Sequence, residues 1–122
     1  MTAQPELSST GIPLIRARRR GPAVRLREAV LTLGAHRGQV LDHDETPWAS
    51  VTYTGARHGF TLLFAGEEAV DAGEGFIAEL PEHEFAIAGQ LVADAEVLEV
   101  EHRVVPSPRL VVRCEVLMLE DG

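Results

Sequence analysis

The sequence predicts an α+β domain in which a single antiparallel β-sheet is covered by two helices. Two β-rich runs flank a glycine-containing turn within residues 48–65, two other stretches carry apolar residues at helical spacing, and the C-terminal third alternates between apolar and polar residues. We expect about five strands, in the order α-β-β-β-α-β-β. A length of 122 residues suits one domain, which we place at residues 22–122, after an N-terminal arm at residues 1–21.

The first helix is predicted at residues 22–33. Residues 1–11 before it are small and polar without periodicity, and residues 12–20 contain Pro13, which allows an edge strand or a connector but no central strand. Gly21-Pro22 and Gly34 supply the start and stop signals of the helix. Its apolar residues recur at helical spacing: Ala23, Leu26, Val30 and Leu33.

A hairpin is predicted next, with strands at residues 48–54 and 58–65. Residues 36–45 before it have the character of a weak polar strand or a loop, and Thr46-Pro47 predicts a break. Thr54-Gly55-Ala56-Arg57 is the predicted turn, which would place Arg57 and the following His58 side by side at the tip of the hairpin.

A second helix is predicted between Gly66 and Leu80, ended by Pro81, with acidic residues in its first turn. Residues 85–105 then form a long alternating strand. Its apolar parity switches at Leu98, which predicts a bulge or bend. A turn at residues 106–108 leads to a last strand at residues 109–120, and together the two strands make a long C-terminal hairpin.

Charge is distributed unevenly along the chain. The net charge is −8, yet residues 1–37 carry seven arginines against two acidic residues, and residues 38–122 carry four arginines against seventeen. The net negative charge argues against nucleic acid as a partner, and no aromatic residue interleaves the arginines. We therefore expect Arg16, Arg18, Arg19 and Arg20 to dock on an acidic protein surface, either of this chain or of a partner.

The expected compartment is the cytoplasm. No apolar run approaches the roughly 20 residues of a membrane helix, and the arginines at 16–20 stand in the wrong order for a secretory signal. Cys114 is the single cysteine and lies in the apolar run of the last strand, so we expect a buried thiol that packs as a small hydrophobe.

Four residues make up a candidate ligand site: Trp48, Arg57, His58 and Asp94. A guanidinium forks onto carboxylate or phosphate, and an imidazole titrates near neutrality, so Arg57 with His58 could bind a small anion and exchange a proton with it. The alternative is that both are ordinary polar residues of a turn. Trp48 equally suits the edge of the core or a subunit contact, and Asp94 a solvated sheet face.

No metal and no cofactor are expected. Asp42-His43-Asp44-Glu45 holds ligand-type side chains, but neighbours in a strand point to opposite faces, and no spacing matches a zinc motif. The sequence also contains no nucleophile-elbow, phosphate-loop or dinucleotide-binding motif. We interpret the acidic tetrad as a solvated loop.

The segments Trp48-Ala-Ser-Val-Thr-Tyr-Thr-Gly-Ala-Arg-His58 and Leu91-Val-Ala-Asp94 carry a resemblance. Over residues 45–100 the chain is similar to a small uncharacterised bacterial family of about this length, whose hairpin motif is W-A-S-x-T-[YF]-x-G-x-R-H. The resemblance implies no activity, ligand or site residue.

The expected function is therefore association without catalysis. The basic first third and acidic remainder favour docking between proteins, and a homodimer is the simplest assembly. The rival hypothesis is an enzyme or binding module for a small anionic ligand, which requires Arg57, His58 and Asp94 to converge on one point.

Overall fold

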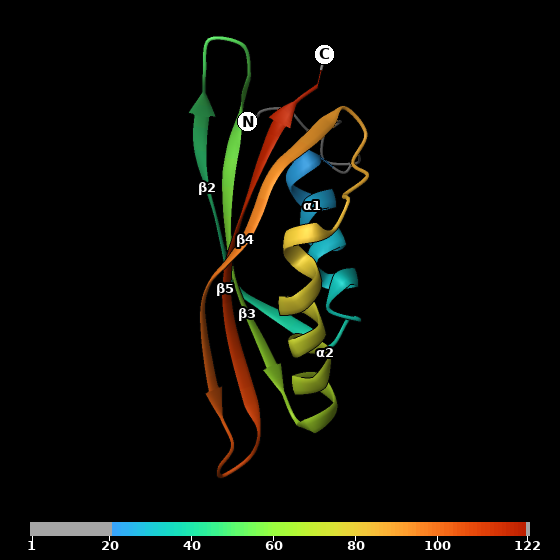
Figure 1. The fold of residues 1–122 in the computed structure, drawn as a ribbon, viewed down its shortest axis with the longest axis vertical. Helices are drawn as coiled ribbons and strands as arrows, with labels where there is room; N and C mark the ends of the chain where they lie inside the picture. Colours follow the sequence, from blue (N-terminus) through green and yellow to red (C-terminus); the bar gives the residue numbers. More distant parts are fainter. Residues whose placement is uncertain (1–20, 122) are drawn as a thin grey trace, which may run out of the picture.

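The structure, a computed structural model, describes residues 21–121. It contains two helices, and each is followed by a pair of long strands (Figure 1). They are α1 (Pro22–Leu33), β2 (Gly38–Ala49), β3 (Thr54–Ala65), α2 (Glu67–Glu79), the 3-10 turn η2 (Leu80–Glu82), β4 (Gln90–Arg103) and β5 (Arg109–Glu120). Residues 1–20, which hold the predicted arm and its arginines, lie outside the described residues.

Within residues 21–121, four strands form one antiparallel sheet in the order β2-β3-β5-β4. Each hairpin follows a helix, so the chain runs helix-strand-strand twice, and the two second strands, β3 and β5, meet at the centre. Both helices lie on one side of the sheet, and Figure 1 shows no described element on the other side. The part of the chain that the structure describes therefore forms two layers and leaves one face of the sheet uncovered.

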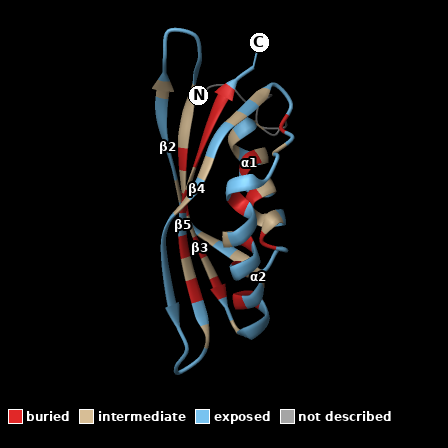
Figure 2. Ribbon diagram, viewed as in Figure 1, coloured by how far each residue is buried: buried red, intermediate tan, exposed pale blue. Residues whose placement is uncertain are grey.

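The core lies between the sheet and the helices, because alternate residues of each central strand point to the helix side. From β3 these are Phe60, Leu62 and Phe64, and from β5 the even-numbered residues from Leu110 to Met118. The helices contribute Leu26 and Val30 from α1 and Val70 and Phe76 from α2. Figure 2 shows this burial along the two central strands and the inner sides of the helices.

The prediction of α+β with one antiparallel sheet is confirmed, but the described residues form four strands where about five were expected. The predicted break at Thr46-Pro47 is wrong, because β2 runs through it. A proline is tolerated there since β2 is an edge strand with one side unpaired. The predicted weak strand and the first hairpin strand are thus one strand.

The predicted turn at residues 54–57 is also wrong. The chain reverses at residues 50–53, and residues 54–57 already belong to β3. Ser50 builds the turn: its hydroxyl oxygen accepts the backbone N–H of Tyr53 at 3.0 Å, and its own N–H donates to the carbonyl of Tyr53 at 2.7 Å.

The C-terminal hairpin follows the sequence more closely. β5 has the predicted bounds, and the bulge expected at Leu98 lies between Val97 and Glu99. A second irregularity, between Val92 and Asp94, was not predicted, and it places Leu91 on the uncovered face instead of the core face. The strand itself begins at Gln90, five residues later than expected.

Candidate functional site

The uncovered side of the sheet, which we call the open face, presents side chains from all four strands. Its side chains follow from the strand register. From one end to the other the cross-strand rows are Trp48-Gly55-Leu119-Leu91, Thr46-Arg57-Leu117-Asp94, Asp44-Gly59-Glu115-Glu96, Asp42-Thr61-Arg113-Glu99 and Gln39-Leu63-Val111-Glu101.

One end of this face is apolar. Leu119 is buried there although it is not part of the core cluster under the helices, and Leu91 beside it is 44% exposed. Trp48 lies across Gly55 from Leu119, and the adjoining turn adds Val51 and Tyr53, both exposed. We call these five residues the apolar corner. Several exposed apolar side chains gathered at one place are typical of a protein contact.

The rest of the open face is rich in carboxylates. Three of them form salt bridges with an arginine. The distances are 3.4 Å for Glu115 with Arg57, 3.6 Å for Glu99 with Arg113 and 3.8 Å for Glu101 with Arg103. Four others, which we call the carboxylate set, form no salt bridge within residues 21–121: Asp42, Asp44, Asp94 and Glu96. All four are exposed and lie on the edge strands β2 and β4.

The helix-covered face carries a histidine pair. Nε2 of His43 lies 3.0 Å from Nδ1 of His58, a hydrogen-bonding distance, and the ring of His43 stacks on Phe60 at 4.1 Å between centroids. His58 is 1% exposed and is the one buried residue with an ionisable side chain, apart from Cys114, among the described residues. Cross-strand pairing brings Glu45 opposite His58.

Burial lowers the pKa of both histidines. For His43 the charges of His58 and Arg27 lower the pKa further, while Glu45 and Asp44 act in the opposite direction. For His58 burial also dominates, again opposed by Glu45 and Asp44. Burial thus favours the neutral form of both rings, and the hydrogen bond needs one of the two facing nitrogens to donate while the other accepts.

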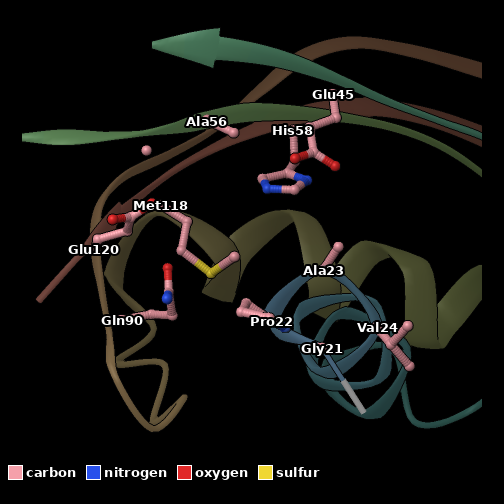
Figure 3. A pocket seen from close by; sticks show the side chains of 11 residues that line it. Gly21, Pro22, Ala23, Val24, Glu45, Ala56, His58, Gln90, Met118 and Glu120 are labelled. Carbon is pink, nitrogen blue, oxygen red and sulfur yellow. The ribbon is translucent and has the colours of Figure 1, made fainter. Parts of the chain in front are cut away.

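A pocket of about 280 Å³ lies where the first turn of α1 approaches the sheet (Figure 3). Figure 3 shows the ring of His58, with Glu45 beside it, projecting from the strands toward Pro22 and Ala23. Gln90, Met118 and Glu120 line the opposite side. The volume is below the roughly 300–1,000 Å³ of ordinary ligand pockets, so the shape does not favour a small-molecule site.

The four residues of the predicted ligand site do not converge. Arg57 and His58 are neighbours in β3 and therefore point to opposite faces, with Arg57 on the open face beside Glu115 and His58 under α1. Asp94 shares a row with Arg57, but Leu117 stands between them. Trp48 lies one row further along. The hairpin tip that was to join Arg57 and His58 does not exist.

The described residues also include metal-ligand types of side chain and one cysteine. Within residues 21–121 no group of three or more His, Cys, Asp or Glu side chains is placed to hold a metal ion. Asp42 and Asp44 share a face from which His43 turns away, as expected, but within a strand rather than a loop. Burial raises the pKa of Cys114 to about 12, so the thiol stays protonated and packs in the core.

No helix in the described part of the chain is long and apolar enough to cross a membrane. The described residues thus define a small two-layer α+β protein with an open sheet face, in which the four residues of the predicted ligand site lie apart.

Comparison with known proteins shows a similarity of fold and no similarity of sequence family. No protein-family model matches the sequence, and neither does any curated protein. Among solved structures, a chain of the virion of a native gene transfer agent particle has a similar fold, with a TM-score of 0.54 and 14% sequence identity. The match covers 90% of this chain and 100% of that chain.

Proposed function

We propose that the protein is a non-catalytic module that acts by associating with protein, and that its simplest assembly is a homodimer. The observation that carries the proposal is the apolar corner of the open face. Trp48 and Tyr53 are the residue types most enriched where protein interfaces are buried, and Leu91 and Val51 extend the apolar surface around them. Two copies of this corner could bury one another around a two-fold axis.

Two further observations support association over catalysis. The separation of Arg57 from His58 by the sheet removes the geometric basis of the anionic-ligand hypothesis. The fold is also found in a virion particle, so the same architecture is compatible with assembly among protein chains. A lone, protonated Cys114 suits a reducing compartment, and we place the protein in the cytoplasm.

Light scattering at micromolar concentration in moderate salt tests the proposal. We expect a mass of twice the 13.2 kDa chain. Leu91→Glu should weaken this association by about tenfold or more, because a carboxylate would be buried against apolar side chains. Leu41→Glu is the matched control, since Leu41 is 50% exposed, also on an edge strand, but remote from the apolar corner.

A wild-type mass of one chain would contradict the proposal. Equal loss of association in both leucine variants would show that the contact does not involve the apolar corner.

A further inference from the structure

Four carboxylates of the open face form no salt bridge within residues 21–121, and the sequence holds four arginines outside the described residues. The carboxylate set consists of Asp42, Asp44, Asp94 and Glu96, and all four members are exposed. The arginines are Arg16, Arg18, Arg19 and Arg20, within the segment 12–20, which has no acidic residue. We call this segment the basic segment.

The carboxylate set would oppose a dimer in which two open faces simply stack. Like charges would then approach each other while water is excluded, which costs free energy unless cations intervene. A dimer through the apolar corner therefore needs cations supplied to the carboxylate set, and guanidinium groups pair with carboxylates through two parallel hydrogen bonds.

The segment joins the described chain at Gly21, on the side of the sheet opposite to the carboxylate set of its own copy. Gly21 lies on the helix side of the sheet, in the wall of the pocket under α1. Arg18, Arg19 and Arg20 stand within three residues of it, and three residues span at most about 11 Å. Packed layers are themselves roughly 10 Å apart, so docking on the same copy would take most of this backbone length only to pass from the helix layer to the sheet.

The same arginines are well placed for a second copy. The pocket that contains Gly21 is also lined by Gly55, Gln90 and Glu120, which lie at the end of the sheet that bears the apolar corner. If two copies are joined at the apolar corner, Gly21 of each copy, where its basic segment joins the described chain, lies near the other copy. Nine extended residues span about 30 Å, and crossing the four strands takes only about 15 Å.

From the charges, the reach and the position of Gly21, we propose that the basic segment of one copy docks on the carboxylate set of a second copy, reciprocally, in the dimer. The inference rests on the proposed self-association and names the contact that stabilises it. In such an exchange each copy donates a segment and accepts one, as two-fold symmetry requires.

Charge reversal in two full-length variants tests the exchange. The arm variant carries Arg16→Glu, Arg18→Glu, Arg19→Glu and Arg20→Glu, and the face variant carries Asp42→Lys, Asp44→Lys, Asp94→Lys and Glu96→Lys. Each alone should dissociate about tenfold or more readily than the wild type, measured by light scattering over a dilution series. An equimolar mixture should restore the dimer, because both charge pairs are complementary again between the two chains.

Two further measurements complete the test. A control variant with Asp71→Lys, Glu74→Lys, Glu79→Lys and Glu82→Lys has the same net charge as the face variant, but its changes lie on α2 and η2, and it should dimerise like the wild type. Raising the salt from 0.1 to 1 M should weaken the wild-type dimer, since the screening length falls from about 10 to about 3 Å. Circular dichroism should show all variants folded.

Failure of the proposed self-association and failure of the segment exchange give different results. A monomeric wild type would overturn the proposed function and the exchange together. A dimeric wild type with undiminished association in the arm variant would overturn the exchange alone. Failure of the mixture to form dimers, with each variant monomeric and folded, would show that the basic segment does not dock on the carboxylate set of another copy.

Discussion

At the scale of single residues, His43 and His58 are the groups whose chemistry depends most on their surroundings. They share a hydrogen bond of 3.0 Å beneath α1, and His43 also stacks on Phe60. Arg27 from α1 and Asp44 and Glu45 from β2 provide the nearby charges. Protonating the accepting nitrogen would replace a hydrogen bond with two donors facing each other, so the pair ties the packing of edge strand β2 to pH.

We therefore expect the free energy of unfolding to fall as the pH drops below about 6.5. The folded-state pKa of each histidine is lowered, mainly by burial, so the unfolded chain binds more protons than the folded chain in the window between the two pKa values. The stabilisation is complete above about pH 6.5 and is lost as the pH passes through the folded-state values. Urea unfolding at pH 7.5 and 5.5 measures it.

The double variant His43→Gln/His58→Gln should lose less stability between these two pH values than the wild type, because glutamine does not titrate. Its control is His83→Gln/His102→Gln, which changes two exposed histidines and should keep the wild-type difference. An identical pH difference in all three proteins would refute a role for the pair.

At the scale of elements, helix α2 offers a comparison between two glycines two residues apart. A Cβ at Gly73 would lie 2.7 Å from Cδ2 of Leu110 and 2.8 Å from the ring of Phe64, whereas at Gly75 no atom lies within 4 Å. Gly75→Ala should therefore stabilise the protein by about 0.5–1 kcal/mol through helix propensity. Gly73→Ala should destabilise it by about 1–3 kcal/mol, because the overpacked side chains must move. Thermal unfolding distinguishes the two, and equal effects would be inconsistent with this packing.

The elements also show what a sequence pattern can and cannot predict. α1 and β5 were predicted with their observed bounds, because each has a regular apolar period and a clear boundary signal, Gly34 after the helix and Pro108 before the strand. The first hairpin was misplaced because Gly55 resembles a turn residue. The real requirement is spatial, since a Cβ at Gly55 would clash with the carbonyl of Met118 on the neighbouring strand.

The misplaced turn explains the errors at the candidate site. With the reversal at residues 50–53, the register pairs Glu45 with His58 and His43 with Phe60, and the histidine pair follows. With the turn at residues 54–57, Arg57 and His58 would have met at an exposed tip instead. Residues far apart in sequence are brought together by register, and a shift of a few residues changes every cross-strand neighbour.

At the scale of the whole molecule, the features divide between the two sides of the sheet. The helix side holds the core, the histidine pair and the root of the basic segment at Gly21, while the open face holds the apolar corner and the carboxylate set. A single copy therefore exposes an acidic face on one side of the sheet, and its basic segment joins the described chain at Gly21 on the other side. Reciprocal exchange between two copies would bring these two opposite charges into contact.

Such a dimer makes stability depend on concentration. If unfolding separates the two chains, each tenfold rise in chain concentration should stabilise the folded dimer by about 1.4 kcal/mol, so the midpoint of thermal unfolding should rise with concentration for the wild type. The arm variant, which dissociates more readily, should show a smaller rise of this midpoint between 1 μM and 100 μM. A wild-type midpoint that is constant over this range, with reversible unfolding, would mean that association does not stabilise the folded chain.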